Sequence, residues 1–176
     1  EDTRDFGTLQ DYERAGIWRE ALWDLVAALP SAIRTLLSDI ALDGTSGTVL
    51  ACDKDLSPRH PPLLYNDDRA ADEAALIART AVPGHPAAAS TSGLAKVLWL
   101  KKRLGLTGAR LYLNQADWLS GLLTGRVGMT DYHNALKMGL DLDALKWPEW
   151  VEYLADVDYL PVPIAPGARL ATVSRP

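Results

Sequence analysis

The sequence has little of what marks several classes of protein. Cys52 is its only cysteine, so no disulfide can form within the chain and a reducing, cytoplasmic setting is expected. No apolar run is long enough to span a bilayer, and no signal peptide is recognisable. Positive charge is not in excess either, because the formal net charge is −5. The sequence therefore argues against nucleic acid or a membrane as the main partner.

What the sequence does contain is an alternation of short apolar runs and helical patterns over 176 residues, which favours one α/β domain with a sizeable core. Apolar spacing, proline and glycine predict helices at 17–29, 31–37, 71–81, 92–104, 115–123, 131–138 and from 148 onward. Strands are predicted at 40–42, 48–52, 62–65, 110–113 and 170–173. Residues 1–16 show no clear period and are expected to be irregular. The prolines after 160 predict an extended connection.

The helix at 92–104 is apolar on most sides and is expected to be heavily buried, with Ser92 as its cap. We expect its polar surface to come from Lys96 and the three basic residues at 101–103. In the helix at 115–123, Asp117 lies in the first turn, where a carboxylate suits the helix dipole.

Two polar clusters in the stretch 38–70 form a candidate site. The first is the turn 43–48, Asp-Gly-Thr-Ser-Gly-Thr, in which glycine allows backbone N–H groups to face open space. The second follows the run 62–65 and begins with Asn66, Asp67, Asp68 and Arg69. Ligands of open α/β sheets gather at the carboxyl ends of strands, so these clusters predict a site for a polar ligand such as a sugar or phosphate.

Five segments carry a resemblance to a known family. IALDGTSGTVLACD, PLLYNDDRA, SGLAKVLWL, QADWLSGLLTG and TDYHNALKMG resemble, in this order, the sugar-holding N-terminal domain of the FGGY carbohydrate kinases. The similarity is closest to the pentulose kinases of the D-ribulose kinase type, which are xylulose-kinase-like. It implies an α/β fold of the ribonuclease H-like, actin-like ATPase type, here without its first strands.

The resemblance also gives the turn 43–48 a role. Taken alone, its sequence looks like the phosphate-cradling turn of actin-like ATPases, but that turn follows the first strand, whereas here about forty residues with a helix precede it. The family places this turn second, as the element that holds the sugar. Ser46 and Gly47 would then face the substrate, where xylulose kinases carry Met-His and glycerol kinases carry Arg-Glu. The alternative is a plain hairpin turn.

The segment 65–69, Tyr-Asn-Asp-Asp-Arg, resembles the family's Trp-Asn-Asp-x-Arg or Trp-Gln-Asp-x-Arg. Tyr65 can lie along a carbon face of the sugar, while its hydroxyl or Asn66 reaches the polar edge. Asp67 is either a sugar ligand or part of an internal ion pair that fixes the loop. For Arg69 the ion pair is the favoured interpretation.

Other conspicuous residues are assigned structural roles. Asp117 is expected to cap its own helix, and Trp118 and Leu119 to lie in the core. His133 is expected to be a satisfied histidine rather than a catalyst, Cys52 a packing residue, and Ser90 only a weak candidate for sugar contact. The histidines and acids show no metal-ligand spacing, so no metal held by protein side chains is expected.

The resemblance implies transfer of the ATP γ-phosphoryl group to a pentulose, D-ribulose first and D-xylulose second, with ATP and Mg²⁺ in the full-length enzyme. In the family, the phosphate-binding turn, the catalytic aspartate and the nucleotide-binding domain lie outside the part that residues 1–176 match. We therefore expect a partial sugar-binding domain, without catalytic or cofactor-binding residues and inactive alone. The alternative is a non-catalytic sugar-binding or regulatory protein. A chaperone-type or filament-type actin-like ATPase has no counterpart to YNDDR followed by QADWL.

Overall fold

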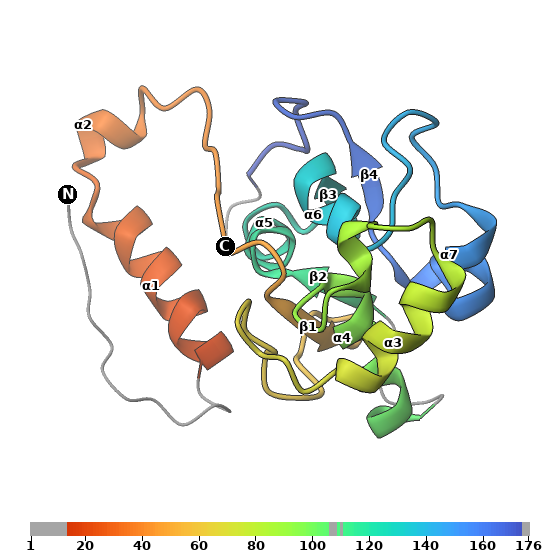
Figure 1. Cartoon of the computed structure of the whole chain (residues 1–176). Coiled ribbons are helices and arrows are strands. Elements are labelled where there is room, and N and C mark those ends of the chain that lie inside the picture. The colour runs from red at the N-terminus through yellow and green to blue at the C-terminus, as the bar shows by residue number, and fades with distance from the viewer. Residues whose placement is uncertain (1–13, 106–108, 110, 174–176) are drawn as a thin grey trace.

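The computed structural model describes residues 14–105, 109 and 111–173. The α-helices are α1 (Arg14–Ala28), α2 (Ser31–Arg34), α3 (Ala71–Thr80), α4 (Gly93–Leu104), α5 (Gln115–Thr124), α6 (Tyr132–Lys137) and α7 (Glu149–Leu154). The strands are β1 (Val49–Cys52), β2 (Leu111–Asn114), β3 (Met129–Asp131) and β4 (Val162–Ile164). Two short 3₁₀ helices, η1 (Pro86–Ala88) and η2 (Val157–Tyr159), complete the set. As Figure 1 shows, α1 and α2 lie to one side of the main body.

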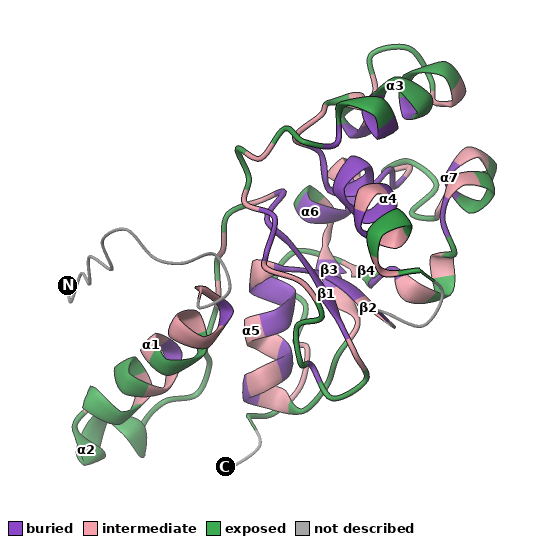
Figure 2. Cartoon of the chain, turned by 90° about the horizontal axis from the view of Figure 1, so that it is seen from below, coloured by how far each residue is buried: buried purple, intermediate pink, exposed green. Residues whose placement is uncertain are grey.

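The centre of the fold is the antiparallel pair β1–β2, with helices on both faces. Val49 lies opposite Asn114 and Cys52 opposite Leu111. Successive side chains of a strand point to opposite faces, and β1 is buried on both. Leu50 and Cys52 pack with Trp118 of α5, whereas Val49 and Ala51 pack with the larger cluster that includes residues of α3 and α4. Figure 2 shows the two strands between α5 on one side and α4 on the other.

Helix boundaries follow the predicted signals closely. Ser92 caps α4 by accepting a hydrogen bond from the N–H of Ala95, and Gly105 ends the helix. Asp117 caps α5 from within, because its carboxylate accepts the N–H of Asn114 at 3.0 Å. Asp131 caps α6 through the N–H groups of His133 and Asn134. Ser31 is the exception: α2 begins after Pro30, and Ser31 makes no cap.

Three predicted strands are not formed. Residues 40–42 belong to no strand, because β2 occupies one edge of β1 and Leu63 the other. The predicted strand at 62–65 shrinks to the bridge between Leu63 and Val49, since Pro61 and Pro62 have no N–H to donate. Residues 170–173 form no strand; β4 lies instead in the proline-rich segment expected to be a connection, parallel to β3.

The remaining expectations divide between core and surface. Trp118 is buried, and its indole N–H donates to the carbonyl of Leu56. Leu119 packs against the same cluster. Cys52 is also buried, and burial raises the pKa of its thiol to about 12. The expectation of an irregular lead-in over residues 1–16 is wrong for 14–16, which belong to α1, and otherwise falls on residues 1–13, outside the described residues. Arg110 of a predicted strand also lies outside the described residues. Within the described residues, no helix is long and apolar enough to cross a membrane.

Asp117 gives the fold a testable pH dependence. Burial raises its pKa from 3.8 to about 7, against hydrogen bonds from Asn114 and Thr130 that favour the carboxylate. Between those pH values the folded chain keeps a proton that the unfolded chain loses. This group therefore lowers the free energy of unfolding as pH rises, by up to about 1.4 kcal/mol per pH unit.

Asp117→Asn removes that titration. Urea unfolding of parent and variant at pH 5, 6 and 7 should show the parent losing stability relative to the variant as pH rises. The contributions of the other carboxylates are the same in both proteins and cancel in the difference between their free energies of unfolding. A difference that stays constant across the three pH values would show that Asp117 titrates normally.

Candidate functional site

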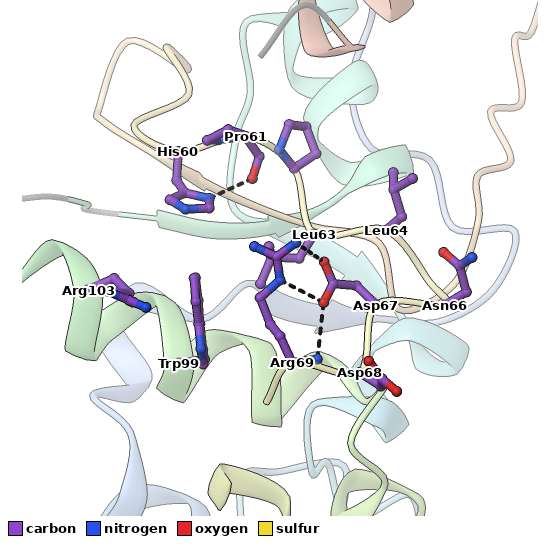
Figure 3. A pocket seen from close by; sticks show the side chains of 11 residues that line it. His60, Pro61, Leu63, Leu64, Asn66, Asp67, Asp68, Arg69, Trp99 and Arg103 are labelled. Atoms are coloured by element: carbon purple, nitrogen blue, oxygen red, sulfur yellow. Dashed lines mark hydrogen bonds and ion pairs between the residues drawn. The ribbon is translucent and has the colours of Figure 1, made fainter. Parts of the chain in front are cut away.

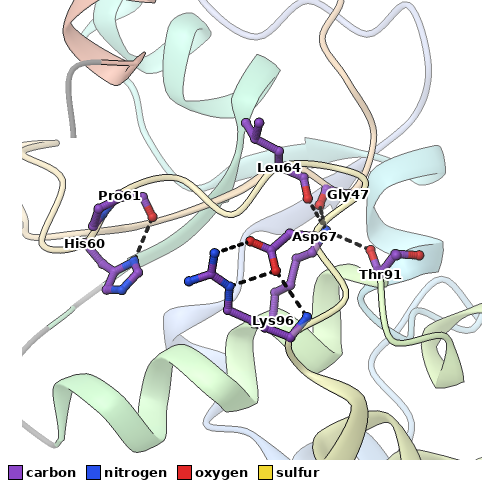
Figure 4. A network of polar contacts seen from close by, with 8 residues as sticks. Gly47, His60, Pro61, Leu64, Asp67, Thr91 and Lys96 are labelled. Carbon is purple, nitrogen blue, oxygen red and sulfur yellow. Dashed lines mark hydrogen bonds and ion pairs between the residues drawn. The ribbon is translucent and has the colours of Figure 1, made fainter. Parts of the chain in front are cut away.

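The two polar clusters predicted from the sequence are joined by a buried lysine. Lys96, expected on the surface of α4, is 0% exposed. Its ammonium donates hydrogen bonds to the carbonyl oxygens of Gly47 at 2.6 Å, Leu64 at 2.6 Å and Thr91 at 2.9 Å. Figure 4 shows these carbonyls converging on Nζ beside Asp67. A buried charge is tolerated only when it is paired and hydrogen-bonded, so these carbonyls decide where Lys96 can lie.

Burial of Lys96 also affects its titration. Desolvation lowers the pKa of its ammonium to about 8; the nearby Asp67 opposes this shift, and Lys137 adds to it. At neutral pH the side chain is therefore still mostly charged. An ammonium has three N–H donors, and here each has a carbonyl acceptor.

The turn 43–48 is anchored by helices rather than by a hairpin. Because residues 40–42 form no strand, the plain hairpin alternative is wrong. The N–H of Thr45 donates to the side-chain oxygen of Gln115 at the start of α5. At Gly44 a Cβ would lie 2.9 Å from the backbone nitrogen of Ala116, so only glycine fits this close approach. Lys137 at the end of α6 donates to the carbonyl of Ser46 at 3.4 Å.

Ser46 and Gly47 lie at the tip of this turn. Gly47 is buried and has φ +87°, in the region that favours glycine. The Ser46 hydroxyl is buried and has no hydrogen-bond partner among the described residues. Within the same part of the chain, nothing accepts a hydrogen bond from the N–H of Ser46 or Gly47. The carbonyls of Ser46 and Gly47 thus accept hydrogen bonds from Lys137 and Lys96. The Ser46 hydroxyl and the N–H groups of both residues have no partner among the described residues.

The second cluster begins directly after the carbonyl of Leu64 that Lys96 holds. Tyr65 is 56% exposed and Asn66 is also exposed, so both side chains are accessible. Asp67 and Arg69 form a bidentate ion pair, with Nε 2.8 Å from Oδ1 and Nη2 2.8 Å from Oδ2. The internal ion pair considered for these two residues is therefore present, and it occupies both carboxylate oxygens of Asp67.

An open pocket of about 880 Å³ adjoins this second cluster. We call it the Trp99 pocket; its wall includes His60, Asn66, Asp67, Arg69, Trp99 and Arg103. Arg69 and Arg103 both lie over the Trp99 ring, 5.3 and 5.1 Å from its centroid, and His60 meets it edge-on at 5.5 Å (Figure 3). Of the predicted site residues, only Asn66 and Asp67 line this pocket; Ser46, Gly47 and Tyr65 do not.

The groups available at the site are polar. Hydroxyl, amide and carboxylate groups suit a polyhydroxylated ligand, and the exposed ring of Tyr65 suits a carbon face. Among residues 14–105, 109 and 111–173, no three histidine, cysteine or acidic side chains gather as a metal site. The Asp131 carboxylate caps α6 and accepts a hydrogen bond from the backbone N–H of His133.

The fold is that of known sugar kinases. A xylulose kinase from Brucella ovis matches over 98% of this chain with a TM-score of 0.77 and 21% identity. A gluconate kinase and a ligand-bound xylulose kinase, both from Lactobacillus acidophilus, match over 99% and 97% of the chain, with TM-scores of 0.70 and 0.71 and 18% identity. No protein-family model matches the sequence. The chain spans 38%, 37% and 38% of these three kinases, and its mixed α/β fold is the actin-like ATPase fold of one of their domains.

The tight contact between Gly47 and Thr91 can be tested by adding one methyl group. A Cβ at Gly47 would lie 3.3 Å from the Thr91 carbonyl, which already accepts from Lys96. Gly84 offers a matched control, since its φ is +78° but nothing lies within 4 Å of its Cβ position. Both substitutions to alanine impose the left-handed strain of about 1–2 kcal/mol. Gly47→Ala should lower the free energy of unfolding further. If urea unfolding shows the same decrease in the free energy of unfolding for both variants, the space next to Thr91 accommodates the added methyl group.

Proposed function

We propose that residues 1–176 are a partial sugar-binding domain of an ATP-dependent carbohydrate kinase of the FGGY family. Its substrate is a pentulose, D-ribulose first and D-xylulose second. The sugar lies against Ser46 and Gly47 on one side and against Tyr65, Asn66 and Asp67 on the other. ATP and Mg²⁺ are assigned to the full-length enzyme rather than to this domain alone.

The observation that carries the proposal is the junction at Lys96. Residues 46–47 and 65–67 belong to separate motifs, and one ammonium binds the carbonyl of Gly47 in the first and that of Leu64, the residue directly before the second. The unused hydroxyl of Ser46 and the unused N–H groups of the turn supply donors for sugar oxygens. Ser46 as a residue is only half-buried, and its side chain has other staggered rotamers available to it.

The similarity in fold supports the same proposal. Two of the three similar structures are xylulose kinases and the third is a gluconate kinase, so all three act on sugars or sugar acids. The sequence segments that resemble the family include both sides of the Lys96 junction. A kinase of this kind needs an aspartate to orient the sugar hydroxyl and a site for the nucleotide phosphates. The proposal places both outside the residues assigned to the sugar.

A non-catalytic sugar-binding or regulatory protein is the second candidate. It is favoured by the Asp67–Arg69 ion pair, because that pair gives Asp67 a structural role in fixing its loop and leaves the described site without a free aspartate beside the proposed sugar contacts. The two functions differ in one measurable respect. A kinase consumes ATP in proportion to the ketose added, whereas a binding protein binds the ketose without consuming ATP.

Ser46→Ala in the full-length enzyme tests the assignment of the turn. A neutral hydrogen bond contributes on the order of 0.5–1.5 kcal/mol net, so its loss should raise the KM for D-ribulose several-fold to about tenfold. The KM for ATP should not change, because the substitution removes one oxygen and adds no bulk. Steady-state kinetics with D-ribulose and D-xylulose, at saturating ATP, provide the measurement.

Ser57→Ala is the matched control. Ser57 is an exposed serine beyond the far end of β1, near the bridge between Cys52 and Pro58. Its removal should leave both KM values unchanged, and melting curves should confirm that both variants are folded. If Ser46→Ala stays within twofold of the parent for both sugars, Ser46 is not a substrate ligand.

A further inference from the structure

We propose that Lys96 is a positioning residue whose protonated ammonium locks the two sides of the candidate sugar site together, so that sugar binding depends on the proton it carries. The part of this proposal that concerns the sugar rests on the proposed function. The part that concerns the lock does not, because it is a statement about three loops of the chain.

The geometry of the lock is complete in the protonated form. The three acceptor carbonyls belong to residues 47, 64 and 91, which precede β1, the 65–69 segment and α4. Lys96 itself lies within α4, a helix held by caps at both ends. The ammonium therefore joins three loops to one rigid element, and each of its three N–H groups has one partner.

The positions of the carbonyls explain why the lock concerns the ligand site. Gly47 is one residue after Ser46, and Leu64 is one residue before Tyr65. A shift of either carbonyl moves the adjacent side chain by a comparable distance. Hydrogen-bonded ligands tolerate little misplacement, since productive geometry is held within about 0.5 Å by supporting residues.

Loss of the proton from Lys96 leaves one of the three carbonyls without a donor. A neutral amine has two N–H donors and one lone pair, so one of the three carbonyls would face a lone pair. Charged groups around Nζ are Asp67, whose carboxylate is paired with Arg69, and Lys137, which donates to the Ser46 carbonyl. Burial lowers the pKa of Lys96 to about 8, with Asp67 opposing the shift and Lys137 adding to it, so this change falls within an accessible pH range.

Deprotonation should loosen the loops without unfolding the chain. A lowered pKa means that the folded chain gives up this proton more readily than the unfolded chain does. Between pH 8 and 10.5 this group therefore raises the free energy of unfolding as pH rises. An effect on sugar affinity in that range would come from local geometry and not from loss of the fold.

Carbon-13 NMR of the protein labelled at its carbonyl carbons and lysine side chains provides the test. From pH 6.5 to 9.5, the carbonyl shifts of Gly47, Leu64 and Thr91 should titrate with the Cε shift of Lys96 at one common pH near 8. Over pH 7 to 9 the Kd for D-ribulose should rise about tenfold, as the competent fraction falls. Lys101, on the same helix, is not the donor to any of these three carbonyls and serves as the internal control.

Substitution completes the test. Lys96→Met should abolish the common titration and weaken D-ribulose binding at least tenfold, whereas Lys101→Met should change neither. Carbonyl shifts that do not follow Lys96 in the parent would overturn the proposal, even if Lys96→Met fails to fold. A folded Lys96→Met with parental affinity would overturn it as well. If the full-length parent binds neither D-ribulose nor D-xylulose, the proposed function fails, and the carbonyl titration still decides whether the lock exists.

Discussion

The arrangement of the site depends on one requirement, that a buried ammonium must have hydrogen-bond acceptors. Lys96 extends from a capped helix into the interior, where an unpaired charge would be very unfavourable. Carbonyls from three loops meet this requirement, and the loops are thereby fixed relative to α4 and to each other. Two features of the site lie next to these acceptors: Gly47 has a left-handed backbone, and the exposed Tyr65 directly follows Leu64.

Elements with strong local signals could be predicted from the sequence, whereas strand pairing could not. The caps Ser92 and Asp131 and the terminator Gly105 act through neighbouring residues, so their chemistry is visible locally. A strand exists only if a partner edge is free. Residues 40–42 have a suitable composition but no edge to join, while β4 forms beside β3 despite Pro163 because an edge position tolerates proline.

For the candidate site, the sequence motifs indicate two separate polar clusters but not the residue that joins them. The two polar clusters were recognised from their motifs, and the structure joins their backbones through a residue that had been placed on the surface. The signal was present: Lys96 is three residues after Gly93 and four before Leu100, both buried, so helical spacing places it on the inner face. Lysine is so often exposed that its residue type predicts a surface position here, against the helical spacing that places it inside. The Trp99 pocket could not be predicted, because its wall joins α4 to residues 60–69, about thirty to forty positions earlier in the chain.

The central claim is that a pentulose binds between the turn and the segment after Leu64. Amide chemical-shift mapping with D-ribulose tests it most directly, because it locates the ligand without assuming catalysis. The account predicts that the largest shifts fall on Ser46, Gly47, Tyr65 and Asn66. Shifts confined to the far wall of the Trp99 pocket, around His60, Trp99 and Arg103, would place the sugar elsewhere and contradict the account.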